Sequence, residues 1–298
     1  MVASCLSPTS LYGGYLRRCF TASGLSSQTI DIDHQTSIHF WGPNTASHKP
    51  VLLLIHGFGP VCLWQWRRQV QYFCADFDVY VPDLIFFGDS TTTSSDRTEV
   101  FQAVSIGKLL EKVGIERYAV MGTSYGGFVA YHMAYMWPER VEKVVIASSA
   151  VNLIRRDNEE LLQRAKLKEI EDLMLPRTAE QLRTLTSLAV FKRLPTIPNF
   201  LWNDIIDKLY SDNREEKKGL LKGLTLGRED TPNISPLQQE VLIIWGDHDQ
   251  IFPLGKAIEL KEVLGEKAKL EVMKKTAHMP QVEFPERFNA IVKNFLCA

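Results

Sequence analysis

Ser124 is the residue of this sequence best placed to act as a nucleophile, because it stands at the centre of a Gly-x-Ser-x-Gly pattern between Gly122 and Gly126. The apolar run before it predicts a strand, and the residues after it predict a helix. A serine in so sharp a turn is held in a strained backbone conformation with its hydroxyl exposed. Since the pattern also fits an ordinary Ser/Gly turn, the interpretation depends on finding a base and an acid elsewhere in the chain.

Candidates for both groups follow later strands. A serine hydroxyl needs a general base, and the base needs an acid that orients it. His278 follows the last predicted strand and Asp249 the strand before it, so both are expected at the same sheet edge as the serine turn. Asp247 is the alternative acid, although directly after a glycine it more readily braces the turn. His248 is interpreted as a solvated loop residue.

Two backbone N–H groups are expected to hold the negative oxygen of a tetrahedral intermediate. One belongs to Tyr125, the residue after the serine, and the other to Phe58 in the loop that follows the apolar strand 51–55. The side chain of His56 in that loop is interpreted as a brace that does not carry protons. Together these residues predict acyl transfer.

Strand-like and helix-like segments alternate along most of the chain, and all-apolar runs such as 51–55 and 141–147 are typical of a parallel sheet covered on both faces. The expected strands are 37–41, 51–55, 78–81, the run from 118, 141–147, 240–245 and 269–273, and the expected helices are 64–74, 99–113, the segment after Ser124 to Trp137, 254–264 and 285–296.

The alternation stops between about 151 and 236, where the sequence is charged and helical in character. Helices are expected at 158–174, 178–191, 203–210 and 214–225. We therefore expect three parts: an N-terminal extension over 1–35, a core formed by 36–150 and 237–298, and a helical cap over 151–236. Within the extension, 11–25 is predicted to be a short amphipathic element packed on the core.

Composition excludes several classes of partner. Lys plus Arg (34) nearly balances Asp plus Glu (35), and no basic stripe alternates with aromatic residues, so a nucleic-acid partner is not expected. No apolar run approaches the length of a membrane helix. The five scattered cysteines indicate reduced thiols and a cytoplasmic protein. The first 30 residues, rich in Ser and Thr, leave an organelle transit peptide as the alternative.

The motifs His56-Gly57-Phe58-Gly59, Gly122 to Gly126, Gly246 to Asp249 and His278, with Gly88-Asp89-Ser90, resemble the α/β-hydrolase superfamily over roughly 38–296. The resemblance implies a mostly parallel central sheet flanked by helices, a Ser124–His278–Asp249 triad, no cofactor or metal, and a lid formed by the inserted segment. Members with an aspartate nucleophile are disfavoured, because serine occupies that position here.

Within the superfamily the chain resembles lidded serine hydrolases numerous in plants. Its Gly-Phe-Gly-Pro loop is also similar to that of the carbon–carbon bond hydrolases of aromatic ring-cleavage pathways. Those enzymes usually have Trp after the catalytic His, whereas this chain has Met279. The loop does not read His-Gly-Gly-Gly, so the chain departs from hormone-sensitive-lipase-like esterases.

The residues expected to line the site are mostly apolar or aromatic, which favours an uncharged substrate. They are Phe58, Leu63, Trp64, Tyr125, Ile251, Phe252 and Met279 from the core, with Leu153, Ile154, Phe191, Phe200 and Trp202 as weaker candidates from the cap.

The sequence thus predicts a serine esterase that cleaves a small apolar or aromatic carboxylic ester. Three alternatives keep the same residues: a carbon–carbon bond hydrolase, a thioesterase, and a small-molecule receptor on this fold. The expected partner is a small-molecule ester, and the near-neutral surface permits a monomer.

Overall fold

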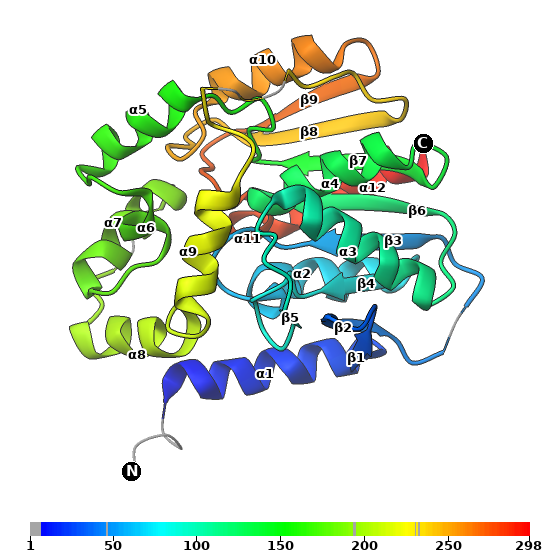
Figure 1. The fold of residues 1–298 in the computed structure, drawn as a ribbon, viewed down its shortest axis with the longest axis horizontal. Helices are drawn as coiled ribbons and strands as arrows, with labels where there is room; N and C mark the ends of the chain where they lie inside the picture. Colours follow the sequence, from blue (N-terminus) through cyan, green and yellow to red (C-terminus); the bar gives the residue numbers. More distant parts are fainter. Residues whose placement is uncertain (1–6, 46, 193–194, 230, 232) are drawn as a thin grey trace.

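The structure is a computed structural model that describes residues 7–45, 47–192, 195–229, 231 and 233–298. It is built on a nine-stranded sheet in the order β1-β2-β4-β3-β6-β7-β8-β9, with β5 paired to β2 (Figure 1). The strands from β4 and β3 through β9 run parallel, while β1, β2 and β5 pair antiparallel. This arrangement confirms the predicted α/β-hydrolase fold.

The strands are β1 (Leu25–Asp31), β2 (Thr36–Pro43), β3 (Val51–Ile55), β4 (Asp78–Pro82), β5 (Thr91–Thr92), β6 (Tyr118–Thr123), β7 (Val141–Ala147), β8 (Glu240–Gly246) and β9 (Ala268–Met273). The helices outside the inserted segment are α1 (Pro8–Ala22), α2 (Cys62–Phe73), α3 (Glu99–Lys112), α4 (Tyr125–Met136), α10 (Leu254–Leu264), α11 (Pro280–Glu283) and α12 (Pro285–Cys297). Neither β5 nor α11 is predicted from the sequence, because both are too short to show a periodic pattern.

Two apolar layers cover the sheet, one on each face. Successive side chains of β3 alternate between them: Leu53 and Ile55 join the layer packed under α3, α4 and α10, while Leu52 and Leu54 join the layer under α1, α2 and α12. Alternation of this kind follows from the pleat of a strand. It explains why β3 reads as a continuous apolar run, since both of its faces are buried.

Residues 7–31 pack on the central sheet and the helix layer beside it. Ser7 caps α1 by accepting a hydrogen bond from the backbone N–H of Ser10. Leu16 and Phe20 on α1 are buried against the α2 layer. β1 then pairs with β2 along its whole length. The predicted packing of this segment on the core is thus observed, with the helix starting three residues earlier than expected.

The inserted segment contains α5 (Arg155–Ala165), α6 (Ile170–Met174), α7 (Ala179–Ala189), α8 (Asn199–Leu209) and α9 (Arg214–Gly223), and no strand among its described residues. The single helix expected over 158–174 is divided, because Lys166 takes a left-handed conformation (φ 55°) that ends α5. A small apolar cluster of Leu182, Trp202 and Tyr210 packs within the segment. The division into cap and core at 151 and 236 stays a prediction.

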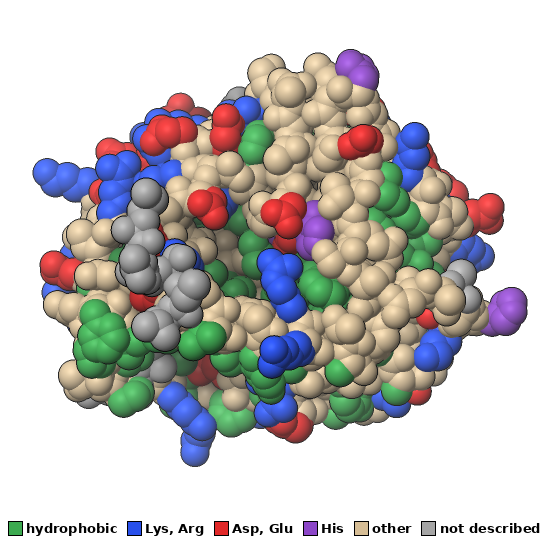
Figure 2. Space-filling model, turned by 90° about the horizontal axis from the view of Figure 1, so that it is seen from below, with side chains coloured by type: hydrophobic (Ala, Val, Ile, Leu, Met, Phe, Trp, Pro, Cys, Tyr) green, Lys and Arg blue, Asp and Glu red, His purple; other side chains and the backbone are tan. Residues whose placement is uncertain are grey.

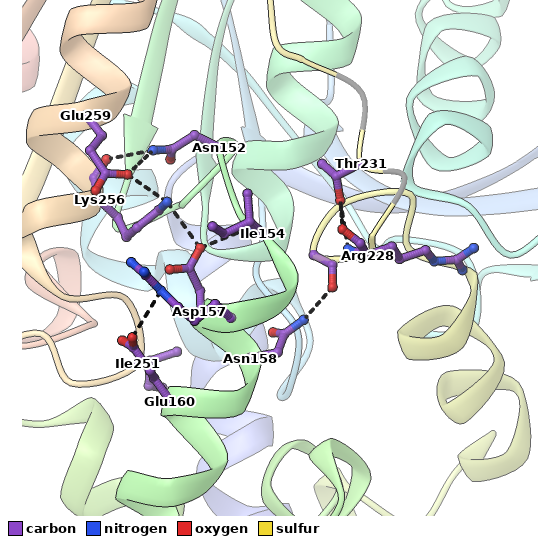
Figure 3. A network of polar contacts seen from close by, with 12 residues as sticks. Asn152, Ile154, Asp157, Asn158, Glu160, Arg228, Thr231, Ile251, Lys256 and Glu259 are labelled. Carbon is purple, nitrogen blue, oxygen red and sulfur yellow. Dashed lines mark hydrogen bonds and ion pairs between the residues drawn. The ribbon is translucent and has the colours of Figure 1, made fainter.

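Polar contacts fasten the cap to the core at both ends. At its start, Asp157 on α5 binds the Lys256 ammonium on α10 at 3.1 Å (Figure 3). At its end, the fully buried Glu99 on α3 accepts hydrogen bonds from the backbone N–H and the hydroxyl of Thr225. Arg97 also pairs with Glu216 on α9 at 2.6 Å. The inserted segment is therefore tied to the rest of the chain through both α5 and α9.

None of the helices formed by the described residues has the length and apolar character needed to span a membrane. Cys19, Cys62, Cys74 and Cys297 are free thiols, whereas Cys5 lies outside the described residues. Burial raises the pKa of the Cys74 thiol to about 11.

Candidate active site

Ser124 stands at the turn from β6 into α4 with φ 51° and ψ −124°, a conformation that residues other than glycine rarely adopt. Its backbone N–H donates to Ala147 O at 3.0 Å. The hydroxyl of Ser149 donates to Ser124 O at 2.6 Å. These two bonds from the β7 side hold the strained turn, and the side chain of Ser124 remains partly exposed.

The two glycines of the motif are required by close backbone approach. A Cβ on Gly122 would lie 2.1 Å from Gly126 O, and a Cβ on Gly126 would lie 2.3 Å from Ile55 O. Both distances are far below van der Waals contact with rigid backbone. The spacing therefore brings β6, α4 and the end of β3 close enough for the turn to form.

The structure brings His278 and Asp249 together. His278 Nδ1 donates to Asp249 Oδ2 at 2.8 Å, and both side chains are almost fully buried. The other carboxylate oxygen, Oδ1, accepts the backbone N–H groups of Ile251 and Phe252, each at 2.9 Å. Asp249 is thus fixed by three donors, and it directs Nε2 of His278 away from itself. This geometry suits an acid that orients a base.

Asp247, the alternative acid, has a different partner. Its Oδ1 binds the exposed His248 Nδ1 at 2.6 Å and accepts the backbone N–H of Thr276 at 3.3 Å. It therefore braces the turn, as its position after a glycine suggested. His248 is a loop residue whose ring packs against Phe191 of the cap.

The loop that carries His278 is bonded to the cap. The backbone N–H of His278 donates to Ala189 O, at the end of α7, at 3.1 Å. Glu283 on α11 accepts the Ala277 N–H at 2.7 Å with one oxygen and the Phe191 N–H at 2.8 Å with the other. The position of the candidate base thus depends on where the cap lies. No local sequence pattern predicts this contact, because it joins residues about ninety positions apart.

The loop after β3 is braced by a side chain that sequence reasoning missed. Gln65 Oε1 accepts the Gly57 N–H at 2.8 Å, and its Nε2 donates to Gly57 O at 3.1 Å and to Pro60 O at 2.6 Å. The loop passes close to the nucleophile, since a Cβ on Gly57 would lie 3.0 Å from Ser124 Cβ. Among the bonds made by the described residues, none uses the backbone N–H of Phe58, so this donor is available to a substrate oxygen.

His56 links the same loop to the loop after β4. Its Nδ1 donates to Gly57 O at 2.8 Å, while Nε2 accepts the Leu84 N–H at 3.0 Å. Burial lowers the pKa of His56, which keeps the ring neutral, with one donor and one acceptor. This is the bracing role expected from the sequence.

The expected pocket residues fall into four groups in the structure. Five of them belong to, or pack against, the apolar layer under α3, α4 and α10: Phe58, Tyr125, Ile251, Phe252 and Met279. The ring of Phe252 lies 5.4 Å from that of His278, and the ring of Phe58 lies 5.9 Å from that of Tyr125. Phe252 therefore contacts the candidate base, and Leu153 joins the same layer.

The other candidates lie elsewhere. Leu63 and Trp64 line a cavity beside α1, and Phe191 and Trp202 line a separate cavity of about 840 Å³ beside His248. Ile154 and Phe200 are exposed. Their role in substrate binding stays a prediction. Tyr210 was not predicted, although its hydroxyl lies only 3.8 Å from the position a Gly59 Cβ would occupy, above the loop after β3.

The described residues contain no group of three or more His, Cys, Asp or Glu side chains arranged to hold a metal ion. The candidate catalytic groups are a serine, a histidine and an aspartate that follow the carboxyl ends of β6, β9 and β8, respectively. The model of the family described as alpha/beta hydrolase fold matches residues 50–285. The chain belongs to this family.

Several known hydrolases are similar to this α/β hydrolase over nearly its whole length. A protein of Paraburkholderia phymatum named 2-hydroxy-6-oxononadienedioate/2-hydroxy-6-oxononatrienedioate hydrolase is 28% identical, covering 93% of this chain and 97% of its own. A Pseudomonas putida protein of the same name, numbered 1, is 25% identical, covering 89% and 94%. These relatives are bacterial, so the likeness to plant hydrolases stays a prediction.

A solved structure shares the fold at lower identity. The 2-hydroxy-6-oxo-6-phenylhexa-2,4-dienoate hydrolase of a Rhodococcus strain superposes with a TM-score of 0.77 at 22% identity, covering 92% of this chain and 99% of its own.

Proposed function

We propose that this α/β hydrolase cleaves a bond beside a carbonyl carbon through an acyl-enzyme on Ser124. His278 takes the hydroxyl proton through Nε2 as Ser124 attacks, and Asp249 stabilises the imidazolium. The N–H groups of Phe58 and Tyr125 hold the oxyanion. His278 then protonates the leaving group, and water attacks the acyl-enzyme by the same route. The observation that carries this proposal is the buried 2.8 Å bond between His278 and Asp249.

For the bond cleaved, we favour a carbon–carbon bond next to a ketone. The support is the likeness to relatives named as oxononadienedioate hydrolases, which extends over 93% of the chain. In such a reaction the electron pair of the broken bond stays on the leaving carbon, which takes the proton from His278. The leaving carbon must therefore be conjugated to a group that stabilises negative charge, as in a dienoate.

Carboxylic ester hydrolysis is the second candidate. Met279 favours it, because it replaces the Trp that usually follows the catalytic histidine in carbon–carbon bond hydrolases. An alkoxide or phenoxide is a better leaving group than a carbon, so the same three residues suffice. A thioester would be cleaved in the same way.

Turnover separates these readings. The purified protein is given a 2-hydroxy-6-oxo-dienoate, whose conjugated absorbance is lost on cleavage, and in parallel a series of p-nitrophenyl esters, with Ser124→Ala as control. Faster Ser124-dependent turnover of the dienoate supports the carbon–carbon reading, and faster ester turnover supports the second candidate. If wild type and Ser124→Ala are equally slow on both, the hydrolase proposal fails, and a single slow turnover per chain favours a receptor.

A further inference from the structure

A second cavity, of about 430 Å³, lies between α1, the end of α8, the start of α9 and the loops that follow β3 and β4. Figure 2 views the molecule from the α1 side and shows a hollow near the centre, with acidic and basic side chains and a histidine near it. Ser124, Asp249 and His278 are not among the residues that line it. Its volume is in the range of small-molecule sites.

Lys217 is the unusual residue of this cavity. It lies on α9 and lines the cavity, yet only 4% of its surface is exposed. Within the part of the chain that the structure describes, its ammonium makes no hydrogen bond and no ion pair, and packs 4.9 Å from the centroid of the Phe87 ring. Burial lowers the pKa of Lys217, although Asp212 and Asp83 partly oppose this. A buried ammonium without a hydrogen-bonded partner is costly, and an anion would offset that cost.

The carboxylates of the cavity are less available to Lys217 than their number suggests. The oxygens of Asp83 accept hydrogen bonds from His39 Nδ1 at 2.8 Å and from the Cys62 N–H at 3.1 Å. Asp89 and Asp212 are both exposed. The lining includes three basic residues, Arg17, Lys208 and Lys217, and three aspartates. Because these charges balance, the cavity suits a monoanion better than a dianion.

Four apolar residues also line the cavity, namely Val61, Leu63, Trp64 and Leu209. We propose that this cavity is a binding site for an amphipathic monocarboxylate, with the carboxylate on the Lys217 ammonium and the apolar body along Leu63 and Trp64. The site is separate from the candidate triad, and the proposal does not depend on the proposed function.

Titration with hexanoate tests the proposal, with hexanamide as the neutral ligand of similar shape. Binding is followed by tryptophan fluorescence, and the signal is assigned to the cavity by its loss in Trp64→Phe, which keeps an aromatic ring against Tyr12. We expect wild type and Ser124→Ala to bind hexanoate equally, and hexanamide at least tenfold more weakly.

Lys217→Met is expected to weaken hexanoate binding at least tenfold and to leave hexanamide binding unchanged. Lys218→Met, one position along α9 and outside the cavity lining, is the matched control and should bind as wild type does. The proposal is overturned if hexanoate does not bind, if the Trp64→Phe variant keeps the signal, or if Lys217→Met binds as tightly as wild type. It is also overturned if hexanamide binds wild type as well as hexanoate does, and this comparison holds even if Lys217→Met fails to fold. Tighter binding of inorganic sulfate, a dianion, would overturn it as well.

Discussion

Replacing Asp249 by Asn should reverse the proton arrangement on His278. The carboxylate uses one oxygen for the N–H groups of Ile251 and Phe252 and the other for His278 Nδ1. An Asn side chain has only one acceptor oxygen. If that oxygen stays on the two backbone donors, the amide NH₂ faces His278, whose Nδ1 must then accept. The ring proton moves to Nε2, which can no longer take a proton from Ser124.

The size of the effect follows from the competing orientation. Turning the amide oxygen toward His278 would leave two buried N–H groups unsatisfied, at about 1–3 kcal/mol each, or about 2–6 kcal/mol in total. The productive tautomer would then be populated in roughly one molecule in 30 to one in 10⁴, since 1.4 kcal/mol is about a factor of ten. We therefore expect kcat to fall by about 30- to 10⁴-fold, with KM nearly unchanged.

Two measurements check this expectation. Steady-state kinetics on the preferred substrate give kcat, and ¹⁵N NMR of the histidine rings reports which nitrogen of His278 carries the proton. Asp247→Asn is the matched control, because Asp247 binds the exposed His248 and should change kcat less than about threefold. A fall of less than tenfold for Asp249→Asn, or a His278 ring that still carries its proton on Nδ1, would refute the reasoning.

Three further results are expected. Gln65→Ala removes the hydrogen bonds that hold the loop after β3 and should lower kcat about 10- to 100-fold with little change in KM. The loss of a whole oxyanion donor costs about 3 kcal/mol, and here the donor is kept but its loop is loosened. Equal kcat in variant and wild type would contradict this. Gly126→Ala should lower the free energy of unfolding by about 2–3 kcal/mol in urea titrations, because its Cβ meets Ile55 O, whereas Gly255→Ala, which meets nothing within 4 Å, should leave it unchanged or higher. Burial lowers the pKa of His56 in the folded protein below the ordinary value of 6.5, so the unfolded chain binds the proton more readily and the stability present above pH 6.5 is lost as the pH falls below it. In urea titrations, the free energy of unfolding should be lower at pH 5.5 than at pH 7.5, and this difference should be smaller in His56→Asn.

Local sequence patterns predicted the strands that carry the candidate residues, because the pattern of apolar residues in a strand reflects which of its faces are buried. The apolar runs of β3, β6 and β8 reflect burial on both faces, and a residue directly after such a strand is brought to the shared carboxyl edge of the sheet. Ser124 was located in this way, and Asp249 and His278 from their places in the loops after the next predicted strands; the preference for Asp249 over Asp247 agrees with the hydrogen bonds.

Contacts between residues far apart in the chain could not be predicted from the sequence. Glu283 and Gln65 bond to loops through single side chains that carry no periodic signal. The cap helices were predicted as elements, but their packing was not, because an inserted segment has no sheet to fix its faces. Phe191 and Trp202, predicted from the cap to line the site, line a cavity beside His248, and their part in substrate binding stays a prediction.

Labelling with a fluorophosphonate tests the central claim, that Ser124 is an activated nucleophile, most directly. Intact-protein and peptide mass spectrometry of the treated protein should show one adduct on Ser124, no adduct in Ser124→Ala, and labelling at least a hundredfold slower in His278→Ala. An unlabelled wild type, or an adduct on another residue that persists in Ser124→Ala, would contradict the account.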